Sequence, residues 1–212
     1  MDWFRRFLAP PQRSAPEVRE IASFFNEAAA DEEHYPSSID PRIYHVKLVR
    51  EHLGDISHKR VADIGCGKGR FARILKEQHP TSKLVALDLA TAMLQAAPAD
   101  LLRCTASMTA LPLASETFDA GYATESLEHA VDIETAIAEL CRIVKPGGRI
   151  VIIDKNAQHW GKLETPTWEK WFTRKQLERL LRRHCREVSS RYISYWEDVA
   201  PDGLFIAWLA TK

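Results

Sequence analysis

From residue 60 onward, short apolar runs alternate with stretches of helical periodicity. Five runs read as buried strands, at residues 60–65, 83–89, 101–107, 117–124 and 149–154. Helical patterns follow the first, second, fourth and fifth of these strands, at 70–79, 90–97, 132–145 and 173–184. Repeated strand–helix–strand units of this kind predict an α/β fold with a mostly parallel sheet and helices on both faces. Two last strands, at 186–196 and 204–211, are expected to form an antiparallel edge.

The first 53 residues differ in pattern, and we expect them to be an extension with cover helices preceding a main domain at 54–212. Two helices are predicted at 16–33 and 41–53, each with proline in its first turn, and proline-glycine-glycine at 146–148 is expected to end the helix at 132–145. Trp3, Phe4, Phe7 and Leu8 flank two arginines. They could form an amphipathic turn that folds onto the domain or touches a membrane.

Charge and cysteine content exclude several classes of protein. Lys plus Arg and Asp plus Glu both number 29, so no overall basic field favours nucleic acid. The sequence has neither a bilayer-spanning apolar run nor the apolar centre of a secretory signal. Its four cysteines form no C-x-x-C pair. We therefore expect a cytoplasmic protein, with its oligomeric state left open.

A glycine-rich loop follows the first predicted strand. Gly65, Gly67 and Gly69 lie between that strand and a helix, and Asp88 ends the next strand 19 residues after Gly69. Glycines let the backbone turn tightly and approach a ligand, and a carboxylate after the second strand can accept hydrogen bonds from ribose hydroxyls. The loop, the helix and the acid together predict a nucleoside-binding site at the carboxyl ends of the strands.

Two classes of nucleoside cofactor compete for this site. Dinucleotides favour G-x-G-x-x-G, which seats a pyrophosphate on the helix N-terminus, whereas this loop reads G-x-G-x-G and follows Asp63. An anion there would repel a pyrophosphate but suits a cationic amino-acid group. The electrostatics therefore favour S-adenosyl-L-methionine.

Residues 60–154 resemble the class I S-adenosylmethionine-dependent methyltransferases. "VADIGCGKG" is similar to their first motif, "LVALDLA" to the second, and "ELCRIVKPGGRIVIID" to the fifth. The resemblance implies a Rossmann-like, doubly wound sheet of seven strands that binds S-adenosyl-L-methionine. It also implies the cofactor-binding residues: Asp63, Gly65 and Gly67 at the methionine part, Asp88 at the ribose, Leu89, Ser107 and Met108 at the adenine, and Ala123 near the sulfonium.

Residues 124–130 read "TESLEHA". If this segment is helical, Glu125, Glu128 and His129 lie on one face. In most of the family such a segment only starts a helix, but ubiquinone-biosynthesis O-methyltransferases and small-RNA 2′-O-methyltransferases use E-x-x-E-H to bind a divalent metal. The first group also resembles this chain at "TPTWEKWF", although its further histidine corresponds to Pro166. His159, seven residues earlier, is the candidate to replace that ligand.

Either of two roles therefore remains open for this segment. Glu125, Glu128 and His129 could bind Mg²⁺ or Zn²⁺, which would activate and orient a hydroxyl. Without a metal, His129 is the first candidate for a general base and Glu125 the second.

The acceptor is expected to bind under a cover made by the N-terminal helices and the segment after the fifth strand. Aromatic residues are frequent in both; they are Phe24, Phe25, Tyr35, Tyr44, Trp160, Trp168, Trp171 and Phe172. Asp154, Lys155 and Asn156 could add polar contacts. We expect a small-molecule acceptor methylated at oxygen; an RNA or other macromolecular acceptor, and a non-catalytic cofactor-binding module, are the alternatives. The basic helix at 174–186 is either a solvated face or a contact for phosphate or an anionic membrane.

Overall fold

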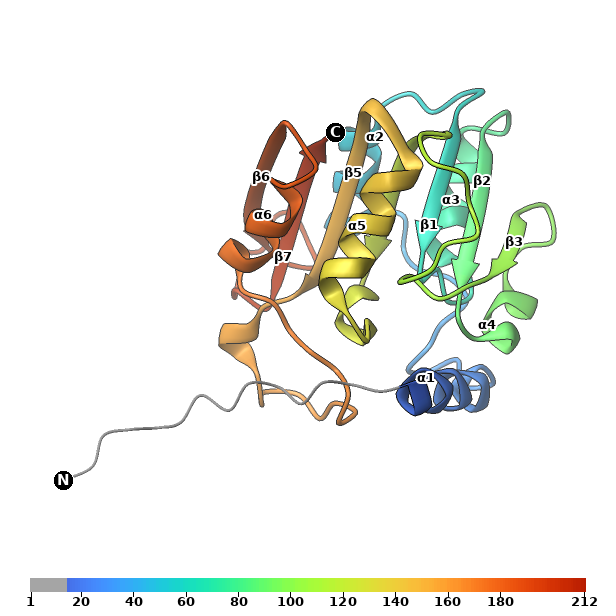
Figure 1. The fold of residues 1–212 in the computed structure, drawn as a ribbon. Coiled ribbons are helices and arrows are strands. Elements are labelled where there is room, and N and C mark those ends of the chain that lie inside the picture. Colours follow the sequence, from blue (N-terminus) through green and yellow to red (C-terminus); the bar gives the residue numbers. More distant parts are fainter. Residues whose placement is uncertain (1–14) are drawn as a thin grey trace.

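The computed structural model describes residues 15–212 as one seven-stranded sheet with helices on both sides (Figure 1). The helices are α1 (Ala15–Ala28), α2 (Tyr44–Leu53), α3 (Arg70–Gln78), α4 (Thr91–Ala96), α5 (Ile133–Ile143) and α6 (Arg174–Leu181), with short 3₁₀ helices at Leu127–His129 and Ala157–His159. The strands are β1 (Arg60–Ile64), β2 (Lys83–Asp88), β3 (Leu102–Thr105), β4 (Phe118–Thr124), β5 (Val144–Lys155), β6 (Glu187–Ile193) and β7 (Phe205–Thr211).

The strand order is β3-β2-β1-β4-β5-β7-β6. Strands β1 to β5 pair in parallel, whereas β7 is antiparallel to both β5 and β6. This arrangement confirms the predicted Rossmann-like, doubly wound sheet with an antiparallel C-terminal edge. All five parallel strands therefore end at the same side of the sheet, where open α/β sheets bind ligands.

Each face of the sheet is covered by helices that contribute a separate apolar cluster. Helices α5 and α6 lie on one face, where Ile137, Leu140 and Leu177 are buried against the sheet (Figure 1). Helices α2 and α3 lie on the other, with Val49 and Leu75 in the second cluster. Helix α2 is thus part of the packed layers, whereas α1 lies beside the carboxyl ends of β1 and β2.

Several predicted boundaries were wrong, among them the end of the first helix, which lies at Ala28 and not at residue 33. Helix α2 begins at Tyr44, not next to Pro41, because Asp40 accepts hydrogen bonds from the backbone N–H and the guanidinium of Arg42 and holds a turn there. The proline-glycine-glycine segment does not end α5, since the helix stops at Ile143 and β5 already begins at Val144. The pairing of β4 with β5 changes register across this segment, so the extra residues bulge out of the sheet.

Two expectations concern the membrane. Trp3, Phe4, Phe7 and Leu8 lie outside the described residues. Within residues 15–212, every helix is too short or too polar to cross a bilayer.

Candidate active site

The glycine loop leaves β1 in a backbone conformation that only glycine adopts readily. Gly65 and Gly67 have φ angles of 69° and 54°. A Cβ on Gly65 would lie 2.5 Å from the Cβ of Ser126, whose hydroxyl donates to the carbonyl of Ile64 over 2.9 Å. At Gly67, in contrast, a Cβ would meet no atom of residues 15–212 within 4 Å. Gly65 therefore lets two chain segments pack, while Gly67 leaves space for a ligand.

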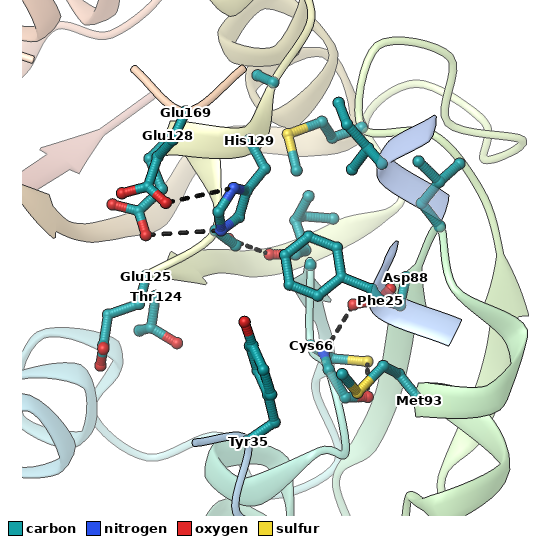
Figure 2. Close-up of a pocket in the computed structure, with 18 of the residues that line it drawn as sticks. Phe25, Tyr35, Cys66, Asp88, Met93, Thr124, Glu125, Glu128, His129 and Glu169 are labelled. Carbon is teal, nitrogen blue, oxygen red and sulfur yellow. Dashed lines mark hydrogen bonds and ion pairs between the residues drawn. The ribbon is translucent and has the colours of Figure 1, made fainter. Parts of the chain in front are cut away.

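Asp88 ties this loop to the end of β2. Its Oδ2 accepts a hydrogen bond from the backbone N–H of Gly67 over 2.7 Å, and its Oδ1 accepts one from Ala90 over 2.8 Å. Burial raises the pKa of Asp88, and these backbone donors oppose the rise. The carboxylate lines the same cavity as Gly67 (Figure 2). Each of its oxygens keeps a lone pair for a sugar hydroxyl.

Asp63 lies beneath the loop and does not reach the cavity. Its side chain is buried, and its Oδ2 accepts a hydrogen bond from the hydroxyl of Tyr122 over 2.9 Å. Burial raises the pKa of Asp63 to about 7. The carboxyl is therefore only partly ionised at neutral pH, which weakens the argument that its charge selects the cofactor.

A cavity of about 620 Å³ opens at the carboxyl ends of the strands. Most of the predicted cofactor residues line it: Gly65, Gly67, Asp88, Leu89, Ser107 and Met108. Ala123 instead packs in the apolar core, and its neighbour Thr124 lies on the cavity wall. The residues present fit S-adenosylmethionine, because the cavity offers an open glycine position beside a carboxylate with acceptor capacity.

Helix α1 and the segment after it cover one side of this cavity. Of the aromatic residues expected in the cover, Phe25 and Tyr35 line the cavity, with ring centroids 5.8 Å apart (Figure 2). Phe24 instead packs edge-on against Trp168, at 5.2 Å. The rings of Phe25 and Tyr35 therefore form an apolar wall of the cavity, next to the polar groups described below.

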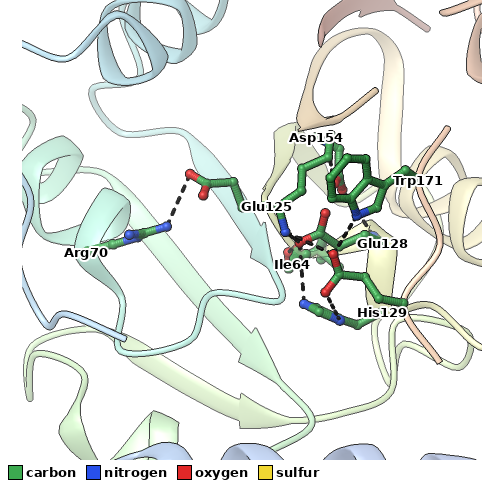
Figure 3. Close-up of polar contacts among 10 residues, drawn as sticks. Ile64, Arg70, Glu125, Glu128, His129, Asp154 and Trp171 are labelled. Carbon is green, nitrogen blue, oxygen red and sulfur yellow. Dashed lines mark hydrogen bonds and ion pairs between the residues drawn. The ribbon is translucent and has the colours of Figure 1, made fainter. Parts of the chain in front are cut away.

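Glu125 and Glu128 do not share a face. Glu125 has a φ of 51° and precedes the short 3₁₀ helix, so the predicted helical stacking does not form. Its Oε1 lies 3.2 Å from a guanidinium nitrogen of Arg70, and the side chain points away from His129 (Figure 3). Glu125 is thus separated from the predicted metal ligands and is less suited to act as the base.

Glu128 and His129 meet Glu169, which comes from the irregular segment before α6. The imidazole Nε2 lies 3.6 Å from Glu128 Oε1, and Nδ1 lies 3.9 Å from Glu169 Oε2 (Figure 2). The ammonium of Lys155 lies 2.7 Å from Glu128 Oε1 and 3.0 Å from Glu169 Oε1. The indole of Trp171 also donates to Glu169 Oε1, over 2.6 Å. We call Glu128, His129, Lys155 and Glu169 the polar cluster.

Burial sets the protonation states in the polar cluster. It lowers the pKa of His129 to about 3, with help from Lys155, so the imidazole is neutral at physiological pH. Burial and the neighbouring Asp154 raise the pKa of Glu128, and Lys155 opposes that rise. Although burial disfavours the charged form of Lys155, Glu128 and Glu169 raise its pKa overall.

The arrangement does not fit the divalent metal that the resemblance implies. Ligand atoms of Glu128, His129 and Glu169 lie within 4.8 Å of one another, as a metal would require. However, Lys155 Nζ already bonds both carboxylates, and a second cation beside it would be repelled. His159 contacts Lys162 Nζ at 2.9 Å and Pro166 has no ligand atom in its side chain, so neither completes a site.

Sequence reasoning missed Glu169 and gave Lys155 no more than a polar contact. Asp154 and Asn156, named together with Lys155, are buried and bond the backbone, at Glu128 N–H and the Gly203 carbonyl. The "TWEK" segment, which contains Glu169, could have pointed to this residue. Glu169 reaches His129 only because of the course that the backbone takes over residues 160–172, and that segment has no periodic pattern from which its course could be predicted.

Comparisons with known proteins relate this chain to methyltransferases. The family described as "Methyltransferase domain" matches residues 62–152. A ubiquinone/menaquinone biosynthesis C-methyltransferase from Syntrophotalea carbinolica is 34% identical over 53% of this chain and 50% of its own length. A malonyl-[acyl-carrier protein] O-methyltransferase from Methylococcus capsulatus is 34% identical over 47% of this chain and 38% of its own. The chain thus spans half or less of the length of these relatives.

A solved structure, the [4+2]-cyclase SpnF, superposes with a TM-score of 0.77 at 17% identity, covering 96% of this chain and 99% of its own. At that identity the likeness shows a shared fold. The family match spans the glycine loop, Asp88 and most of β5, so residues 62–152 belong to the methyltransferase-domain family.

Proposed function

We propose that this protein transfers a methyl group from S-adenosylmethionine to an oxygen atom of a small molecule. The observation that carries the proposal is the joining of two chemically different ends in a cavity of about 620 Å³. One end has the glycine loop and Asp88, and the other has the polar cluster. A cavity of this size is typical of small-molecule sites.

The cofactor end offers hydrogen-bond acceptors and close backbone approach. Asp88 would hold the ribose hydroxyls, Gly67 would let the amino-acid part lie against the loop, and Leu89 and Met108 would flank the adenine. When bound, S-adenosylmethionine supplies a methyl group on a positively charged sulfur, which leaves as a neutral thioether. The protein's contribution at this end is alignment.

At the acceptor end, His129 is the proposed proton acceptor. Its neutral form dominates because burial lowers the pKa, and within residues 15–212 its Nδ1 has no hydrogen-bond partner. The proton of an acceptor hydroxyl would pass to this nitrogen as the oxygen–methyl bond forms. Burial and Lys155 disfavour the resulting imidazolium, and the carboxyl groups of Glu128 and Glu169, at 3.6 and 3.9 Å, would offset part of that cost.

The polar cluster favours oxygen as the methylated atom. A hydroxyl must lose a proton during methylation, and this end of the cavity has a neutral imidazole to take it. The two relatives described above include one C- and one O-methyltransferase, so the comparison alone leaves the atom open. The apolar wall of Phe25 and Tyr35 would suit an aromatic hydroxyl compound.

The proposal can be tested in two steps. Calorimetry should detect binding of S-adenosylmethionine and no binding of a pyridine dinucleotide; the reverse result would refute it. A panel of catechols, hydroxybenzoates, other alcohols, carboxylic acids and RNA ends should then be assayed with radiolabelled cofactor. We expect label transfer to a hydroxyl compound, reduced at least about 100-fold in His129→Ala. Transfer only to carbon or to RNA would contradict the proposed acceptor.

A further inference from the structure

Lys155 occupies the position between two acids that a bound metal would otherwise take. The residue ends β5, where its backbone pairs with Phe205, so its starting point is fixed by the sheet. From there its ammonium reaches Glu128 Oε1 at 2.7 Å and Glu169 Oε1 at 3.0 Å. The ring of Trp171 lies 5.5 Å below the ammonium, within the range of a cation–π contact.

Lys155 and a divalent ion would compete for the same two carboxylates. Oxygen ligands approach Mg²⁺ or Zn²⁺ to about 2.0–2.2 Å, so an ion bound by either oxygen of these carboxylates would lie close to the ammonium. The side chain of Lys155 is 16% exposed and Glu128 and Glu169 are 2% and 3% exposed, so water can do little to screen the repulsion. A metal could enter only if Lys155 left.

We propose that Lys155 is the resident cation of this site and orients the methyl acceptor in place of a divalent metal. The acceptor part of this inference rests on the proposed function. An ammonium has three N–H donors, of which Glu128 and Glu169 take two, so one remains to hold an acceptor oxygen. A positive charge at that oxygen favours loss of its proton, as a metal would.

The charges of the polar cluster also indicate what kind of acceptor it takes. Two carboxyl groups face one ammonium, His129 is neutral, and burial and Asp154 raise the pKa of Glu128, so the cluster carries no net positive charge. A carboxylate or phosphate group would therefore find no net attraction at this end of the cavity. Within the described part of the chain, Glu128 Oε2 and His129 Nδ1 are buried without hydrogen-bond partners, and both can accept from a hydroxyl. The polar cluster as a whole thus favours an uncharged hydroxyl group.

The inference is tested by metal binding, which needs no knowledge of the acceptor. Mn²⁺ is titrated into wild type and Lys155→Met, and free Mn²⁺ is followed by its electron paramagnetic resonance signal. Wild type should bind no Mn²⁺ at this site, whereas Lys155→Met should gain one equivalent through Glu128, His129 and Glu169. The double variant Lys155→Met/Glu169→Gln should lose it again, and Lys155→Arg should bind none because it keeps the charge.

Two results would overturn the inference. One is stoichiometric Mn²⁺ binding by wild type that Glu169→Gln abolishes; the other is no gain in Lys155→Met. Circular dichroism checks folding, and Lys155→Gln replaces the methionine variant if that variant does not fold. Where an acceptor has been found, wild-type turnover should survive a chelator and Lys155→Met should raise KM for the acceptor about 10-fold or more, with rescue by Lys155→Arg. If the Mn²⁺ result holds and no acceptor is methylated, only the proposed function fails.

Discussion

The ammonium of Lys68 lies 2.6 Å from Glu32 Oε1 and 3.2 Å from the backbone carbonyl of Asp31. Lys68 belongs to the glycine loop, and its side chain is 1% exposed, while the acids follow helix α1. The contact therefore fastens the cover of the cavity directly to the glycine loop that lines it. A substitution in the glycine loop should therefore alter the mobility of the cover, and a substitution in the cover should alter the loop.

We expect Lys68→Met to loosen the segment from residue 18 to residue 36. The variant removes both contacts to that segment but keeps a long apolar stem in the buried position. Hydrogen exchange should show faster exchange of the amides of this segment. Lys47→Met is a matched control, because Lys47 pairs with Glu197 at the surface, away from α1. Equal exchange in wild type and Lys68→Met would mean that the pair does not hold the cover.

Asp88→Ala should weaken binding of S-adenosylmethionine by about 10- to 100-fold. Hydrogen bonds to a charged group contribute about 1.5–3 kcal/mol, and this carboxylate is the proposed partner of the ribose. Calorimetry measures the affinity directly. Asp119→Asn serves as a control, since that acid binds Arg60 N–H and Lys145 at the opposite end of the parallel strands. An unchanged affinity in Asp88→Ala would refute the ribose assignment.

The stability of the protein should fall as pH rises through the titration of Asp63. The folded state holds this proton up to a pKa of about 7, whereas an unfolded aspartate loses it near 3.8. Between these values the folded state binds more protons, so the free energy of unfolding decreases with pH. From pH 5 to 8 the contribution of Asp63 should fall by about 3 kcal/mol.

Urea unfolding of wild type and Asp63→Asn at both pH values isolates this effect. Asparagine keeps an acceptor for the Tyr122 hydroxyl but cannot titrate, so its stability should depend less on pH. Other titrating groups act equally on both proteins and cancel in the comparison. The same pH dependence in both proteins would show that Asp63 is ionised when folded.

Gly65→Ala should destabilise the fold more than Gly67→Ala. Both residues have positive φ, which costs about 1–2 kcal/mol for alanine. The new Cβ at Gly65 would also press on Ser126, at 2.5 Å, whereas the space around Gly67 is open among the described residues. The clash should add about 1–3 kcal/mol in urea unfolding. Gly67→Ala should lower cofactor affinity and cost only about 1–2 kcal/mol from its backbone strain.

The sheet and the cofactor end were predictable because their signals are local. The alternation of strands and helices predicted the sheet, and the spacing from the glycines to Asp88 placed the glycine loop and Asp88 at the carboxyl ends of neighbouring strands. The positions of the residues at the acceptor end depend instead on single backbone angles and on irregular segments. The φ of Glu125 turned that acid toward Arg70, and the course of residues 160–172 brought in Glu169. Neither the φ of Glu125 nor the course of residues 160–172 is accompanied by a periodic pattern of apolar residues from which it could be predicted.

Strand β7 comes after β6 in the chain but lies between β5 and β6 in the sheet. As the polypeptide leaves the ribosome, β6 therefore emerges before β7, the strand with which it pairs. Until β7 emerges, one edge of β5 stays unpaired. Unpaired strand edges invite pairing with other chains. Newly made molecules should be most prone to aggregate in the interval before Phe205–Thr211 emerges, and a chaperone that shields this edge would be most useful then.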